Sequence, residues 1–129
     1  MRRTRRTRPA GRTRSVEDAV ARQVLRLVGL GVRSRGAVVG VERVREAARR
    51  GKLSLALLAT DASKHSLSKV VPLLAARRVR VVNAVKATAL GHAVGRDQTT
   101  VVGIIDRQLA QGIRELTDSA PRSQGEGSA

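Results

Sequence analysis

The stretch Asp61-Ala62-Ser63-Lys64 follows an apolar run. Further along the chain come an apolar helical segment, a Val-rich segment and then Leu90-Gly91-His92-Ala93-Val94-Gly95. Each piece is common, but their order is specific. The apolar run, residues 53–59, predicts a strand buried in the centre of a sheet. Asp61 or Ser63 is expected to cap the helix that comes next, because both side chains accept hydrogen bonds from free backbone N–H groups.

The helix expected after this cap has an apolar face. Its residues recur at i, i+3, i+4, i+7 and i+8, and they are Leu67, Val70, Val71, Leu74 and Ala75. Pro72 lacks the N–H that would continue the helix, so it should kink the helix or begin a fresh turn. Residues 79–82 then predict a second buried strand, and residues 86–94 a short helix.

Similar patterns lie on either side of this central part. Residues 15–28 predict a helix that ends at the breakers Gly29, Gly31 and Gly36, and residues 37–39 predict a short strand that Gly40 closes. A helix is expected from Val41 until Gly51, with its apolar residues on one face and its charged residues on the other. Residues 100–105 predict a third strand, and residues 107–116 a closing helix.

Helices that alternate with short buried strands indicate an α/β fold, a three-layer alpha-beta-alpha sandwich with a small mixed sheet. A length of 129 residues allows one domain. We expect a disordered basic arm over residues 1–14, a folded domain over residues 15–118 and a flexible polar tail over residues 119–129. We see no internal repeat.

The formal net charge of +16 points to a polyanionic partner. Residues 1–14 hold seven Arg and no acid, a charge of +7, and residues 15–121 hold eighteen basic and nine acidic residues, a charge of +9. A GC-rich genome or a solvated cationic face would give a similar composition. The chain has no Phe, Tyr or Trp on which single-stranded bases could stack, so recognition by shape, backbone amides and polar side chains is favoured.

Several site classes are disfavoured. The chain has no Cys, so it forms no disulfide or thiolate metal site, and no apolar run is long enough for a membrane span. The Arg-rich start lacks the apolar core of a secretory signal, so a cytoplasmic location is expected. His65 and His92 lie far apart in the sequence without further ligands, which favours surface residues over a metal or general-base site.

The chain resembles the kink-turn-binding ribosomal proteins, the large-subunit seven-Ae and thirty-e group, and in particular their small bacterial members. The resemblance covers residues 20–116. Its landmarks are Gly40 opening a helix, Arg50-Gly51-Lys52 before a buried strand, Leu57-Leu58-Ala59-Thr60-Asp61-Ala62-Ser63, Val71-Pro72-Leu73-Leu74 before the next strand, and Leu90-Gly91 with Gly95.

The resemblance implies the same sandwich fold and an RNA partner, a sharply bent duplex in the ribosome or its assembly. The amino end of the helix that begins at Gly40 would grip this RNA, because free N–H groups and a partial positive charge suit phosphate. The loop after Gly95, residues 96–99, would contact phosphate or sugar. The expected RNA-binding residues are Gly40, Glu42, Arg43, Arg45, Glu46, Lys64, Lys86 and Arg96.

This chain departs from the family's pattern after Gly40. Glu42, Arg43 and Glu46 stand where kink-turn readers carry Asn, Glu and Lys or related residues. One alternative is therefore a nonspecific basic nucleic-acid-binding protein that has lost kink-turn specificity. Another is a recognition domain related to RNA methyltransferases, although no methyl-donor site fits in the remaining residues. We expect a monomer that is not an enzyme and needs no cofactor or membrane.

Overall fold

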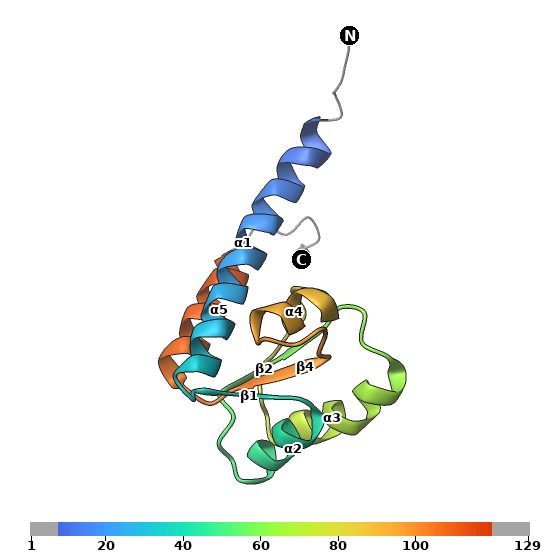
Figure 1. The fold of residues 1–129 in the computed structure, drawn as a ribbon, viewed down its shortest axis with the longest axis vertical. Helices are drawn as coiled ribbons and strands as arrows, with labels where there is room; N and C mark the ends of the chain where they lie inside the picture. Colours follow the sequence, from blue (N-terminus) through green and yellow to red (C-terminus); the bar gives the residue numbers. More distant parts are fainter. Residues whose placement is uncertain (1–7, 120–129) are drawn as a thin grey trace.

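A computed structural model describes residues 8–119, with side chains described for residues 17–118. The chain runs from the long helix α1 through alternating strands and helices to α5 (Figure 1). The elements in order are α1 (Arg8–Arg33), β1 (Ala37–Val39), α2 (Val41–Arg49), β2 (Leu55–Leu58), α3 (Lys64–Ala76), β3 (Val81–Val82), α4 (Ala87–Ala93), β4 (Val101–Ile104) and α5 (Arg107–Ser119).

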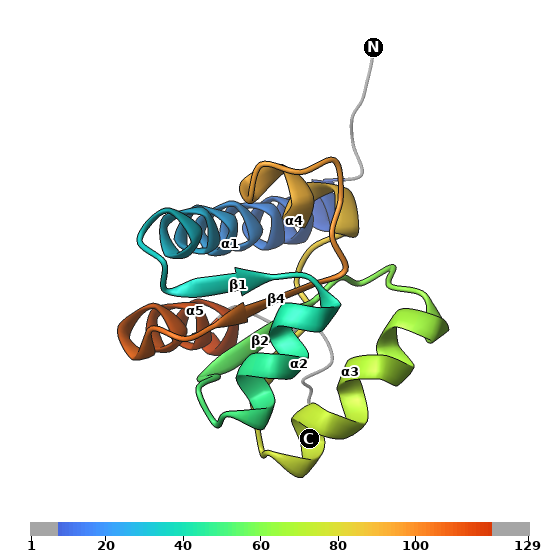
Figure 2. The same cartoon turned by 60° about the horizontal axis from the view of Figure 1, so that its bottom comes forward.

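The four strands form one mixed sheet in the order β1-β4-β2-β3. The strand β4 is antiparallel to both of its neighbours, with Gly103 opposite Val38 on one side and Ala56 on the other. The strands β2 and β3 are parallel, with Ala56 opposite Val81. Helices cover both faces, and Figure 2 shows α2 and α3 side by side below the sheet. The predicted three-layer alpha-beta-alpha sandwich is confirmed.

Alternation along β2 divides the core between the two faces. Leu55 and Leu57 pack into a cluster with residues of α1, α4 and α5, while Ala56 and Leu58 pack into a second cluster with residues of α2 and α3. All four side chains are buried, as the apolar run predicted. Each fully buried Leu contributes about 1.5 to 3 kcal/mol relative to an exposed one.

Most of the predicted elements are confirmed. Helix α2 ends at Arg49, just before Gly51, which adopts a φ of 69° and whose N–H donates to the Ala48 carbonyl oxygen at 3.0 Å. The strand predicted over residues 79–82 is shorter: β3 contains only Val81 and Val82, lies at the edge of the sheet, and leaves Val81 half-buried. Pro72 lies inside α3, which extends to Ala76.

Helix α1 contradicts the expected stop at the glycines, because it continues through Gly29 and Gly31 to Arg33. Packing explains this. A Cβ added at Gly31 would lie 3.2 Å from the Cβ of Ala37, and one added at Gly29 would lie 3.0 Å from the carbonyl oxygen of Ala93. Glycine costs about 1 kcal/mol in a helix relative to alanine, but here it lets the helix lie close to its neighbours.

The amino end of α1 also differs from the expected boundary. The predicted disordered arm covered residues 1–14, whereas α1 begins at Arg8. Pro9 does not prevent this start, because the first helical turn has no internal partner for its N–H groups. The rest of the arm, residues 1–7, and the tail from residue 120 lie outside the described residues. Among the helices described, none is both long enough and apolar enough to cross a membrane.

Candidate nucleic-acid interface

Backbone hydrogen bonds gather four loops at one end of the sheet, which we call the loop end. It comprises the carboxyl ends of β1, β2 and β3 and the amino end of β4. The N–H of Gly40, after β1, donates to the carbonyl oxygen of Val101 at 3.0 Å. The N–H of Ala59, after β2, donates to the carbonyl oxygen of Thr100 at 2.8 Å. The amino end of α2 therefore lies beside the loop that precedes β4.

The loop after β3 joins the same end through three further hydrogen bonds. The N–H of Thr60 donates to the carbonyl oxygen of Val85 at 2.8 Å, and the N–H of Thr99 donates to that of Ala87 at 3.1 Å. The side chain of Asp61 accepts from the N–H of Ala87 at 2.8 Å. The amino end of α4 is thus fixed to the turns after β2 and before β4.

The amino terminus of α2 is open. Gly40 occupies the N-cap position with φ 99° and ψ 160°, and none of the side chains that the structure describes caps the first turn with a hydrogen bond. The first helical hydrogen bond there runs from the N–H of Val44 to the carbonyl oxygen of Gly40 at 3.0 Å. Apart from Gly40 itself and its two chain neighbours, no described residue has a heavy atom within 4 Å of the place where a Cβ of Gly40 would stand. An anion can therefore approach these N–H groups closely.

Three of the predicted cations belong to the loop end, and all three are exposed. Lys64 is the first residue of α3, and Lys86 is the N-cap residue of α4. Arg96 lies in the loop between α4 and β4, where its backbone N–H donates to the carbonyl oxygen of Gly91 at 2.8 Å. These positions come from three segments that the sequence separates and the fold brings to the same end of the sheet.

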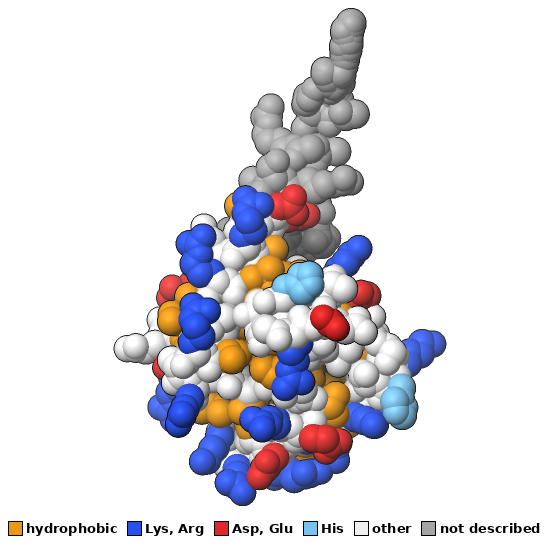
Figure 3. All heavy atoms as spheres, in the orientation of Figure 1, with side chains coloured by type: hydrophobic (Ala, Val, Ile, Leu, Met, Phe, Trp, Pro, Cys, Tyr) orange, Lys and Arg blue, Asp and Glu red, His pale blue; other side chains and the backbone are white. Residues whose placement is uncertain are grey.

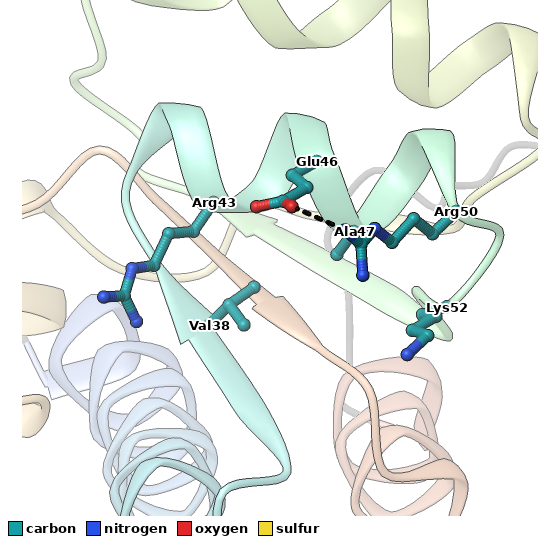
Figure 4. Close-up of a pocket in the computed structure, with 6 residues that line it drawn as sticks. All are labelled: Val38, Arg43, Glu46, Ala47, Arg50 and Lys52. Atoms are coloured by element: carbon teal, nitrogen blue, oxygen red, sulfur yellow. Dashed lines mark ion pairs between the residues drawn. The ribbon is translucent and has the colours of Figure 1, made fainter.

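The exposed face of α2 carries two more of the predicted residues, Arg43 and Glu46, beside β1. Arg43, Glu46 and Arg50 line a shallow depression there (Figure 4). The carboxylate of Glu46 pairs with the guanidinium of Arg50 at 3.1 Å, and Arg43 extends to the other side. Both members of the pair are about 60% exposed, 60% for Glu46 and 63% for Arg50, so the pair contributes only a few tenths of a kcal/mol.

Arg45 and Glu42 occupy different surroundings. The guanidinium of Arg45 donates to the carbonyl oxygen of Lys69, so Arg45 joins α2 to α3. Glu42 is exposed in the first turn of α2. The structure therefore separates Arg45 from Arg43, although only one residue lies between them in the sequence.

The sequence did not identify the role of Asp61. Ser63 caps α3 by accepting from the N–H of Ser66 at 3.1 Å, and Asp61 instead holds the first residue of α4. This contact spans 26 residues, so no local pattern indicates it. Gly91 has a packing role, because a Cβ there would lie 2.3 Å from the Cα of Gln98.

Both histidines are exposed, at positions 65 and 92. Within the described part of the chain, no three His, Cys, Asp or Glu residues come together in a way that could hold a metal ion.

The sequence and the fold both match known proteins. Residues 22–119 match the family model of the ribosomal protein L7Ae/L30e/S12e/Gadd45 family. A protein of unknown function from Bacillus halodurans is 28% identical, with a TM-score of 0.69 over 74% of this chain and 97% of that chain. The Giardia lamblia 15.5kD RNA binding protein is 22% identical, with a TM-score of 0.67 over 79% of this chain and 88% of that chain.

The comparison with curated proteins gave no match. The family model nevertheless covers most of the chain, from the middle of α1 to the end of α5. The chain therefore belongs to the ribosomal protein L7Ae/L30e/S12e/Gadd45 family.

Proposed function

We propose that this protein binds structured RNA of the kink-turn kind and acts in the ribosome or in its assembly. The observation that carries the proposal is the open amino terminus of α2 at Gly40, placed beside the loop end and its cations. Membership of a ribosomal protein family and the fold shared with an RNA binding protein of Giardia lamblia support it.

The chemistry of this end suits an RNA backbone. The free N–H groups of the first turn of α2 and its helix dipole favour a phosphate oxygen, and Gly40 leaves space for the sugar and phosphate to approach. Lys64, Lys86 and Arg96 would contact further phosphates on either side of the bend. These contacts position the RNA without reading its sequence.

The exposed side chains of α2 would recognise the bases. The carboxylate of Glu42 only accepts hydrogen bonds, so it suits an amino or imino group on a base edge, and Arg43 only donates. A bent RNA exposes such edges where its bases leave regular pairing. The role is therefore binding, and we propose no enzymatic activity or cofactor.

One observation favours the second candidate, a nonspecific nucleic-acid binder. Glu46 places a carboxylate on the exposed face of α2 and pairs it with Arg50. A carboxylate there repels phosphate, and its partner cation is partly neutralised. The two candidates differ in what they predict for RNA shape, because only kink-turn recognition requires the bend.

The test compares one kink-turn duplex with the same duplex without its bulge, at salt concentrations from 50 to 200 mM. We expect tighter binding to the kinked RNA, and a loss of about a thousandfold in affinity over this range for roughly six phosphate contacts. Arg43→Ala should weaken binding to the kinked RNA by about 1 to 3 kcal/mol, whereas Arg107→Ala, on α5, should change it little. Equal binding to both duplexes would support the nonspecific candidate, and salt-independent binding would refute both.

A further inference from the structure

Three arginines of α1 form a row on one side of the helix. At 3.6 residues per turn, Arg22, Arg26 and Arg33 fall within an arc of about 40°. Val24 and Val28, which are fully buried, lie on the opposite side of the same helix. The row therefore faces away from the core, and we call it the arginine row.

The side chains of the row that the structure describes are free of ion pairs. Arg22, Arg26 and Arg33 are exposed, and among the described residues no carboxylate lies within ion-pair distance of any of them. Asp18 stands one helical turn before Arg22 but does not pair with it. Arg22 and Arg26 are like charges four residues apart, which costs a helix a few tenths of a kcal/mol. The row thus presents uncompensated positive charge.

The row is long enough to face several phosphates of an RNA stem. From Arg22 to Arg33 it spans about 17 Å at 1.5 Å per residue. Figure 1 shows α1 continuing beyond the sheet and past α4. Figure 3 shows Lys and Arg side chains along the edge of the molecule where Figure 1 places α1 and α5.

The row is placed so that one RNA can reach both it and the loop end. Helix α1 lies against the carboxyl end of α4, where a Cβ at Gly29 would stand 3.0 Å from the carbonyl oxygen of Ala93. The amino end of α4, at Ala87, is tied to the loop end through Asp61. An RNA stem that leaves the loop end past α4 would therefore run alongside α1.

Helix α1 continues outside the segment shared with the family. The family match begins at residue 22, whereas α1 begins at Arg8. In the sequence, Arg8 and Arg12 repeat the four-residue spacing of Arg22 and Arg26.

From these observations we infer that the arginine row is a second RNA-binding surface, which contacts the phosphates of a double-stranded stem next to the site at the loop end. The inference rests on the proposed function for its partner, because it takes RNA as the polyanion. Backbone contacts of this kind give affinity and salt dependence without sequence preference.

The test uses two kink-turn RNAs that differ only in stem length, about 10 and about 24 base pairs, so that the longer stem extends further along α1. The wild-type protein should bind the long-stem RNA more tightly. The triple variant Arg22→Gln, Arg26→Gln, Arg33→Gln should lack this gain and keep its affinity for the short-stem RNA. The variant removes three cations from the phosphates, so the negative slope of log affinity against log salt should become shallower by about 2.7. Raising the salt from 50 to 200 mM should then weaken long-stem binding about 40-fold less than it does in the wild type.

A matched control removes the same charge elsewhere. Arg77, Arg107 and Arg114 are exposed and lie at the end of α3 and along α5, so changing all three to Gln gives the same net charge of +16 − 3 = +13. This control should keep the preference for the long stem. Substituting the row with Lys should keep it too, because the charges remain. Circular dichroism and thermal unfolding establish that each variant is folded.

The outcomes separate this inference from the proposed function. If the wild-type protein gains nothing from the longer stem, or if the control triple weakens long-stem binding as much as the row triple, the inference is wrong. If the protein binds kinked and unbulged RNA equally but still gains from the long stem through the row, the inference stands and the kink-turn proposal fails.

Discussion

Gly91 gives the sharpest test of how the loop end is built. Its replacement by Ala would place a Cβ 2.3 Å from the Cα of Gln98, 2.6 Å from its N and 2.7 Å from its carbonyl carbon. Ordinary contact begins near 3.4 Å, so the loop or α4 must move by about 1 Å. The obstructing atoms are backbone, so no side-chain rotation relieves the clash.

The expected loss of stability follows from two opposing effects. Overpacking costs about 1 to 3 kcal/mol, with this site at the upper end, and alanine recovers about 1 kcal/mol of helix propensity. We therefore expect Gly91→Ala to lower the free energy of unfolding by about 2 kcal/mol, or the melting temperature by roughly 8 to 16 °C. Urea and thermal unfolding followed by far-UV circular dichroism measure both, since the chain has no aromatic fluorophore.

Gly112 is the matched control, because it is also a glycine inside a helix. A Cβ there would lie 3.3 Å from a terminal methyl of Leu27, which can shift by a few tenths of an ångström. Gly112→Ala should therefore stay within about 1 kcal/mol of the wild type. If Gly91→Ala were as stable as Gly112→Ala, the close contact between α4 and the loop before β4 would be refuted.

Three other substitutions test single features of the loop end and α2. Glu46→Lys should tighten kink-turn binding by about 1 to 2 kcal/mol, because a charge-assisted contact replaces repulsion, and an equal gain on the unbulged duplex in the same titration would favour the nonspecific candidate. Asp61→Ala should lower the unfolding free energy in urea by about 1 kcal/mol, because the N–H of Ala87 loses its acceptor; unchanged stability would contradict the capping role. Gly40→Ala should cost about 1 to 3 kcal/mol in the same assay through its φ of 99° alone, and a stable variant would show that this conformation is not required.

Local patterns predicted much of the fold because each element carries its own signal. The apolar run of β2, the two-sided pattern of α2 and the Ser63 cap all depend on residues within one or two turns of each other. The sandwich followed from their alternation. These predictions needed no knowledge of which segments meet in space.

The predictions that failed depended on contacts between distant segments. Gly29 and Gly31 were expected to end the first helix, because the sequence does not show that Ala93 and Ala37 pack against them. Asp61 was expected to cap the helix that follows it, because the sequence does not show that the N–H of Ala87 lies beside its carboxylate. The sequence indicated RNA contacts near Gly40, and these remain predictions. It did not show that Arg45 joins α2 to α3, or that Arg22, Arg26 and Arg33 are exposed on one side of α1.

The loop end is held together mainly by bonds between backbone groups, such as those from Gly40 to Val101, Ala59 to Thr100 and Thr60 to Val85. Such bonds do not depend on which side chains the residues carry. The exposed residues of α2 and of the loop before β4 can therefore be substituted without breaking the backbone hydrogen bonds of the loop end. A library randomised at positions 42, 43, 46 and 96–98 should consequently contain many folded proteins, and selection from it should yield new RNA preferences on an unchanged scaffold.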